Sequence, residues 1–167
     1  MLAVLAEVED VLPALLQDER LWQSLYVDYH PPTVERLWAA WGDYRVSLHR
    51  IHPCEREQAL FHPHPWPSAM RVLEGDYEMA VGFGAGSETP PVAALMIVRG
   101  DFRYEMTHPD SWHYVRPLGR PTLSVMVTGK PWARDAPKSS RPLLPLRSEQ
   151  VAELLRLFRE RYPGDAR

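Results

Sequence analysis

Two histidines set two residues apart between prolines are the side chains of this chain best suited to metal chemistry. They are His62 and His64, in the run Phe61-His62-Pro63-His64-Pro65. Residues i and i+2 share one face of a β-strand, whereas on a helix they point to different sides. Proline fixes φ near the extended range and disfavours helix at the residue before it. The spacing therefore predicts an extended segment that presents both imidazoles to one metal ion.

A third ligand must come from another part of the chain, and the best candidate is His113. It lies about fifty residues downstream, in a run that is itself predicted to be a strand. Three neutral imidazoles suit one divalent transition metal, Fe(II), Zn(II), Ni(II) or Cu(II), whereas Mg²⁺ and Ca²⁺ prefer oxygen. His108 and Glu105 are candidates for a further ligand or for an acid or base in the pocket.

The residues that follow the histidine pair predict a substrate pocket. Trp66, Ser68 and Met70 share the parity of the two histidines, so a regular strand would place them beside the metal. Core packing explains Trp66 and Met70 equally well, and a turn explains Ser68. His49 and His52 have opposite parity, so at most one of them can face such a pocket.

The elements that must position these side chains are mostly short strands. The period changes to two at Tyr44, and Gly, Pro, Asp and Ser separate the strands predicted at 58–64, 69–74, 76–83, 92–99, 101–107, 112–116 and 122–128. The glycine-rich run 82–87 is predicted to be a hairpin loop. Apolar spacing predicts helices in the first forty residues, including a short one over 33–41, and a final helix from Ser148.

The histidine motifs resemble those of the cupin superfamily. His62-Pro63-His64-Pro65, with Gly75 eleven residues after the second histidine, is similar to the first cupin motif. Gly100-Asp101 leading to Trp112-His113 is similar to the second. The two regions span residues 56–117. Where the family has a metal-binding glutamate, this chain has Ser68.

This resemblance implies an all-β fold, a single-domain jelly-roll β-barrel with a metal held inside by His62, His64 and His113. We expect an N-terminal helical extension over 1–43, the barrel over 44–130, and a Pro-rich tail with a C-terminal helix packed on the barrel over 131–167. The barrel closes the sheet edges that a small β protein would otherwise expose.

The composition of the chain limits the kinds of partner that the protein can be expected to bind. The chain has 167 residues, 45% hydrophobic and 25% charged, which is typical of one globular domain. A net charge of −3 and no basic block argue against nucleic acid, and no apolar run is long enough to span a membrane. A single cysteine and a start that makes a poor signal peptide predict a cytoplasmic protein.

The missing glutamate points to an open centre of three histidines. This arrangement resembles the subset of cupins that includes the thiol dioxygenases, which implies a non-haem iron dioxygenase-type enzyme, with Fe(II) favoured, acting on a small polar organic substrate. The alternatives are a cupin that binds a small molecule without turnover, and a zinc or nickel cupin that acts as an isomerase or hydrolase. The resemblance also implies a homodimer.

Overall fold

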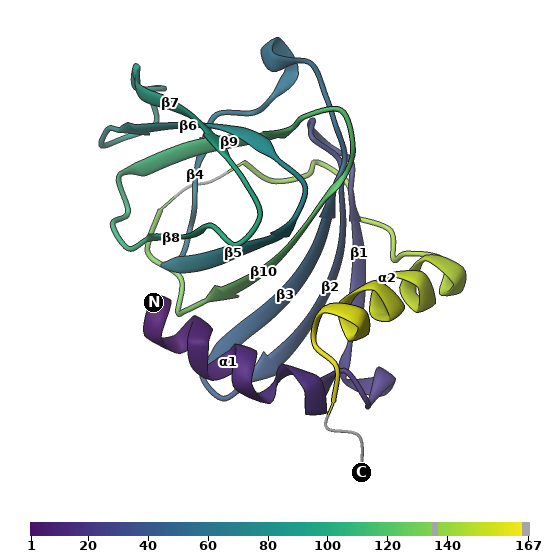
Figure 1. The fold of residues 1–167 in the computed structure, drawn as a ribbon. Coiled ribbons are helices and arrows are strands. Elements are labelled where there is room, and N and C mark those ends of the chain that lie inside the picture. Colours follow the sequence, from purple (N-terminus) through teal and green to yellow (C-terminus); the bar gives the residue numbers. More distant parts are fainter. Residues whose placement is uncertain (135–136, 165–167) are drawn as a thin grey trace.

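The alternating residues after Tyr44 form antiparallel strands in the computed structural model (Figure 1). The structure describes residues 1–134 and 137–164. These strands are β3 (Tyr44–Ile51), β4 (His62–Pro63), β5 (Ser68–Glu74), β6 (Tyr77–Phe83), β7 (Val92–Val98), β8 (Arg103–Met106), β9 (Ser111–Pro117) and β10 (Thr122–Thr128). They confirm most of the strands predicted from the sequence, and the glycine-rich run does join β6 to β7 in a hairpin. The strand predicted over 58–64 is reduced to β4, because a 3₁₀ turn occupies Arg56–Gln58.

The N-terminal segment differs from the prediction. Its helical part is α1 (Leu2–Leu15), followed by a short 3₁₀ turn (Glu19–Leu21) and two strands, β1 (Gln23–Val27) and β2 (Val34–Trp41). The helix predicted over 33–41 is therefore wrong. β2 pairs with β3 along its whole length, and Gly42, with φ +56°, makes the tight turn between them. Cross-strand pairing overrides the helix-like spacing of the apolar residues.

The strands form two antiparallel sheets. The larger has the order β1-β2-β3-β10-β5-β8 and the smaller the order β4-β9-β6-β7. Strands far apart in the sequence, such as β3 and β10, are thus neighbours. The two sheets face each other as a sandwich, which confirms the predicted jelly-roll architecture. The predicted closure into a barrel is wrong, because the two sheets stay separate and keep open edges.

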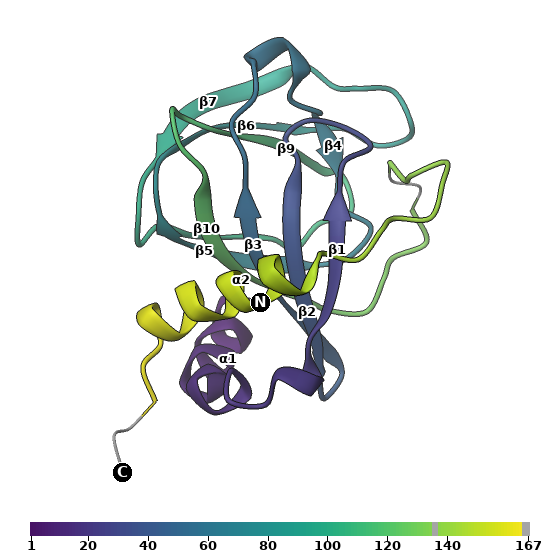
Figure 2. The ribbon, with the colours of Figure 1, turned by 90° about the vertical axis from the view of Figure 1, so that its right-hand side faces the viewer.

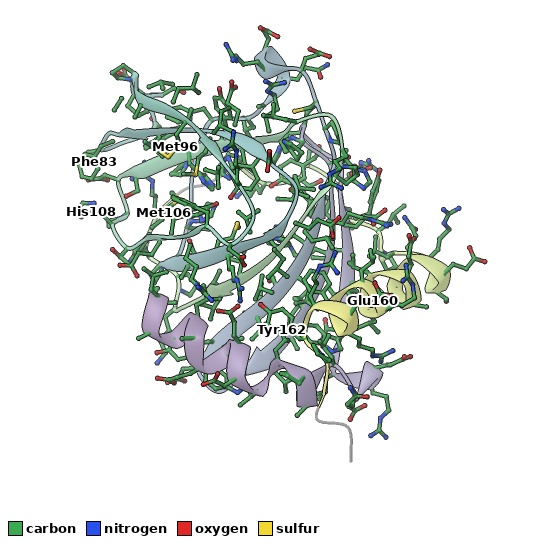
Figure 3. All side chains as sticks on the ribbon, in the orientation of Figure 1. Phe83, Met96, Met106, His108, Glu160 and Tyr162 are labelled. Atoms are coloured by element: carbon green, nitrogen blue, oxygen red, sulfur yellow. The ribbon has the colours of Figure 1, made fainter. Side chains whose placement is uncertain are left out.

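The two helices cover the outer face of the larger sheet (Figures 1 and 2). α2 (Ser148–Arg161) begins at the predicted residue. The core between helices and sheet is made of fully buried aliphatic and aromatic side chains, including Leu5, Val8 and Leu12 of α1, Leu154, Leu155 and Phe158 of α2, and Leu48 and Val125 of the sheet. Tyr162, just beyond α2, donates a hydrogen bond to Glu9 of α1 (Figure 3). The helices thus brace the larger sheet from outside.

A second core fills the space between the sheets. It contains Val34, Ile51, Val72, Tyr77 and Met79, which point inward from strands of both layers. The inward side chains next to this core include the polar ones considered below.

Neither α1 nor α2, the α-helices of the described residues, combines the length and apolar character needed to cross a bilayer. The structure contains one chain, so the homodimer stays a prediction, as does the cytoplasmic location.

Candidate metal centre

Strand pairing brings the three predicted histidines together. β4 runs antiparallel to β9, and in this register His62 lies directly opposite His113. His64 follows immediately after β4. One ring nitrogen from each histidine lies within 4.8 Å of the others, and the ring centroids are 4.5 to 5.4 Å apart. Pairing of two strands thus explains how residues fifty positions apart form one cluster.

Hydrogen bonds orient two of the three rings. Nδ1 of His62 lies 2.8 Å from the carbonyl oxygen of Leu60, so Nδ1 carries the proton and Nε2 keeps its lone pair. Nδ1 of His64 lies 3.0 Å from the hydroxyl of Ser68. Such partners are what metal-binding histidines use to fix the tautomer and the ring orientation.

The spacing of two ring nitrogens is close to that of two ligands on one ion, and it also fits a hydrogen bond between the two rings. Nε2 of His64 and Nε2 of His113 are 2.8 Å apart. Two nitrogens that each lie 2.0–2.1 Å from one ion are about 2.9 Å apart at a right angle and about 3.3 Å apart at the tetrahedral angle. Nδ1 of His113 is buried and finds no hydrogen-bond partner among residues 1–134 and 137–164. The residues present therefore fit a bound transition metal.

Burial keeps the three imidazoles neutral. Desolvation lowers the pKa of His62 to about 4, and it lowers the pKa values of His64 and His113 well below their ordinary value of 6.5. The positive charge of Arg36 lowers the pKa of His62 and His64 further. Neutral imidazoles are the form that binds metal, so protons do not compete for this cluster near pH 7.

A cavity of about 170 Å³ opens beside the cluster, between the two sheets. Most of its wall is apolar, with Val34, Ile51, Val115 and Met126 among the contributors. Its polar wall residues include Arg36, His49 and Tyr29. No Asp or Glu occurs among the described residues that line it. The cluster thus borders a cavity that has no negatively charged side chain among its described wall residues.

The structure places the predicted pocket residues as follows. Trp66 and Met70 line this cavity, and the indole nitrogen of Trp66 is buried without a partner among the described residues. Ser68 is 4% exposed and contacts His64 rather than the open space. The position where the cupin motif has a glutamate therefore holds a hydroxyl that contacts His64.

Two further candidates lie away from the cluster, which corrects the hypothesis that they join it. The side chain of His108 is exposed and lies next to Phe83, with the two rings tilted, at the outer edge of the molecule (Figure 3). Glu105 accepts hydrogen bonds from the backbone nitrogens of Met1 and Leu2. On β8 the side chain of Met106 is buried, so Glu105, its neighbour, faces outward.

Two inward-facing residues of the larger sheet add to the site. His49 on β3 is buried and lines the cavity, whereas His52 lies 3.5 Å from Glu35. This agrees with the parity argument that only one of the two can face the pocket. Arg36 on β2 lies opposite His49 and also lines the cavity. Sequence reasoning missed Arg36 because it assigned the segment to a helix.

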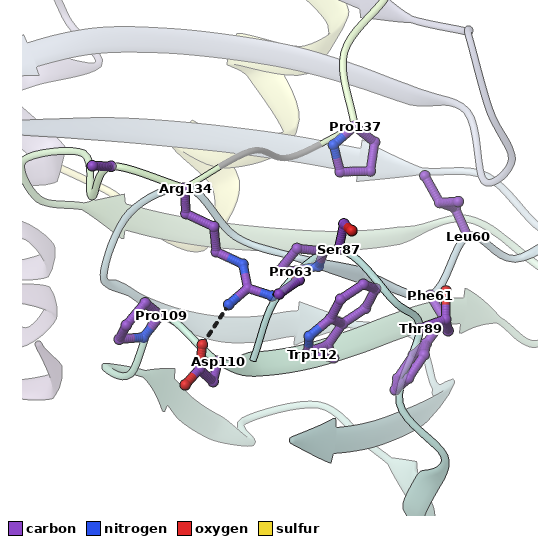
Figure 4. Close-up of a pocket in the computed structure, with 12 residues that line it drawn as sticks. Leu60, Phe61, Pro63, Ser87, Thr89, Pro109, Asp110, Trp112, Arg134 and Pro137 are labelled. Atoms are coloured by element: carbon purple, nitrogen blue, oxygen red, sulfur yellow. Dashed lines mark hydrogen bonds and ion pairs between the residues drawn. The ribbon is translucent and has the colours of Figure 1, made fainter. Parts of the chain in front are cut away.

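A larger cavity, of about 710 Å³, adjoins the first (Figure 4). The two share Leu60, Pro63 and Pro137, but none of the three clustered histidines lines the larger one. Its main charged group is Arg134, which pairs with Asp110 at 2.7 Å and lies over the ring of Trp112. This arginine is already paired with a carboxylate, whereas the smaller cavity is the one that the histidine cluster lines.

No protein-family model and no curated protein matches the chain. Solved structures do. Hydroxypropylphosphonic acid epoxidase from S. wedmorenis aligns with a TM-score of 0.52 at 13% identity, covering 67% of this chain and 57% of that one. The Fe(II) form of HppE in complex with substrate aligns with a TM-score of 0.53 at 12% identity, covering 67% and 58%. This chain thus spans less than three fifths of the length of those proteins.

Identity this low informs on fold alone. The aligned structures are cupin-fold proteins. The present chain has two antiparallel sheets and a histidine cluster at the positions of the cupin motifs. The chain therefore has a cupin-like fold.

Proposed function

We propose that the protein is a metal-dependent enzyme of the non-haem iron dioxygenase type, which acts on a small polar organic molecule at His62, His64 and His113. The observation that carries this proposal is the convergence of three neutral imidazole nitrogens within 4.8 Å of one another at the wall of a cavity. A purely structural cluster of histidines would not need an adjoining open space.

Iron(II) bound by three neutral imidazoles would supply open coordination positions and redox chemistry with dioxygen. The residues of the chain provide the rest. The Leu60 carbonyl and the Ser68 hydroxyl hold the rings of His62 and His64, and the apolar wall excludes bulk water from the bound substrate.

Two observations favour iron and an open centre. No described residue of the cavity wall offers a carboxylate, and among the wall's histidines only His62, His64 and His113 converge closely enough to share one ion. Among the similar folds is an enzyme solved in its Fe(II) form. Zinc at the same ligands would instead activate a water for hydrolysis.

Metal analysis tests the proposal. The purified protein, reconstituted with Fe(II) without oxygen, should hold close to one equivalent, and His113→Ala should lose it. His108→Ala is the matched control, because its imidazole is exposed and lies outside the cluster. Absence of bound Fe(II) or Zn(II) in the wild type would refute the metal centre.

Dioxygen consumption tests the reaction class. The iron form should consume dioxygen with at least one member of a panel of small thiols, acids and diketones, and the His113→Ala protein should not. Metal binding without consumption across the panel would instead support the binding protein without turnover.

A further inference from the structure

The side chain of Arg36 points from its strand, β2, into the space between the two sheets. On β2 it shares a face with Val34, which belongs to the core between the sheets. Its cross-strand neighbour on β3 is His49, and its Nε donates a hydrogen bond to Nε2 of that histidine at 3.0 Å. Within the described residues this is the only hydrogen bond that the Arg36 side chain makes. The two terminal nitrogens of the guanidinium are left for another partner.

The other inward or partly buried arginines are neutralised by the protein itself. Arg50 pairs with Glu35, Arg71 with Glu9, and Arg134 with Asp110. No carboxylate of residues 1–134 or 137–164 pairs with Arg36 in this way. A charge removed from water without a partner is costly, so side chains in this situation usually have a ligand as partner.

The surroundings of Arg36 offer no negative charge either. His49 accepts a hydrogen bond at Nε2 and is therefore neutral, and the three clustered imidazoles are neutral as well. Burial is the main cause that lowers the pKa of Arg36 to about 10; the charge of Arg45 also lowers it, Tyr29 raises it, and the guanidinium stays charged at pH 7. A divalent metal at the histidines would add to this positive field. The cavity is thus suited to an anion.

We propose that Arg36 binds the carboxylate or phosphonate group of the substrate, with His49 holding the guanidinium in place. This inference rests on the proposed function, because it takes the cavity beside the histidines as the substrate site. The guanidinium presents a planar fork that matches such a group.

The cavity limits the size of the substrate. Its volume of about 170 Å³ is below the roughly 300–1,000 Å³ of pockets that take drug-sized ligands. The wall between Arg36 and the histidines is largely apolar, with Val34, Ile51 and Met126. The substrate is therefore a small organic acid with a short apolar body, whose anionic group contacts Arg36 while another part faces the metal centre.

Titration of the metal-free protein isolates this contact. Butyrate, propylphosphonate and the neutral analogue butyramide are added to ¹⁵N-labelled protein, and the Arg36 Nε–H signal and the affinity are recorded by NMR. Either anion or both should shift this signal, and butyramide should not. The stronger anion identifies the headgroup. Arg36→Met should weaken its binding about 10- to 100-fold, as expected for hydrogen bonds to a charged group.

Arg45→Met is the matched control. Arg45 lies on β3 in the same sheet and stacks on Trp38, but it is exposed and outside the cavity wall. Its loss should change anion affinity less than twofold. An equal effect of both variants would mean that general charge attraction explains binding, and it would overturn the assignment.

The stability of Arg36→Met separates binding from a structural role. If Arg36 serves a ligand, removing a charge that has no carboxylate partner should offset the loss of its hydrogen bond to His49, so that the melting temperature of the free protein stays unchanged or rises. Anion binding that persists in Arg36→Met, or failure of both anions to bind the wild type, refutes the inference.

Repeating the titration with Zn(II) distinguishes the two proposals. A protein that binds the anion but no metal contradicts the metal centre and leaves Arg36 supported. A protein that binds metal but shows the same anion affinity with and without Arg36 supports the centre and refutes the anion contact.

Discussion

Acid should destabilise the metal-free protein because of its buried histidines. Desolvation lowers the pKa of His62 from 6.5 to about 4 in the folded state. Between these two values the unfolded chain binds a proton that the folded chain does not. The free energy of unfolding therefore falls as the pH is lowered through 6.5 toward 4, by about 1.4 kcal/mol per pH unit for each such proton.

The loss from His62 alone can be worked out. Between pH 7.5 and pH 5, a pKa of 6.5 unfolded and about 4 folded gives a loss of about 2 kcal/mol. His49, His64 and His113, whose pKa values are also lowered well below 6.5 by burial, add losses of the same sign. Against a typical total stability of roughly 5–15 kcal/mol, this is a large effect.

Urea unfolding followed by tryptophan fluorescence at pH 7.5, 6.5, 5.5 and 5 measures it. His62→Gln should reduce the difference between pH 7.5 and pH 5 by about 2 kcal/mol. His108→Gln, which replaces an exposed imidazole, should keep the full difference. A free energy of unfolding that is constant or rises as the pH falls from 7.5 to 5 would refute the reasoning that the cluster is buried and neutral.

Three substitutions test other parts of the structure. Ser68→Ala removes the hydroxyl beside Nδ1 of His64 and should weaken metal binding about 10- to 100-fold, measured by competition with a chromogenic chelator. An unchanged metal affinity would mean that this contact does not orient the ring of His64. Phe158→Ala empties a fully buried site between α2 and the sheet and should cost about 3–5 kcal/mol in urea unfolding. Gly75→Ala should lower the melting temperature, because Gly75 has φ +80° and an added Cβ would lie 2.8 Å from Cγ2 of Thr122; a melting temperature equal to that of the wild type would contradict this.

The metal cluster could be predicted because its signals are local. His62 and His64 lie within three residues of each other, and the prolines around them restrict the backbone whatever the rest of the chain does. For His113 only a strand assignment was needed, and the strand predicted over 112–116 is β9 in the structure. The register that places it opposite His62 is a property of the assembled sheet and could not be read from either segment.

His108 and Glu105 show the limit of such reasoning. Both have ligand chemistry and both precede His113 in the chain. Glu105 faces outward because its strand alternates, and its actual partners are backbone nitrogens at the start of α1, about a hundred residues away. Contacts across that distance in sequence depend on how α1 docks, which no local pattern specifies.

The inward position of Arg36 was missed because residues 33–41 were assigned to a helix and not to a strand. Val34, Leu37, Trp38 and Trp41 are spaced as on one side of a helix, and a helix with that apolar side turns Arg36 toward solvent. On a strand the residues that share a face are Val34, Arg36 and Trp38, so the same arginine points between the sheets. What decides between the two is the pairing of β2 with β3 across Gly42, which gains a full ladder of hydrogen bonds. In a segment that precedes a glycine turn and a clear strand, an arginine that alternates with apolar residues therefore indicates a charged group between the sheets of a sandwich. In this chain that arginine lies in the wall of the cavity beside the three histidines.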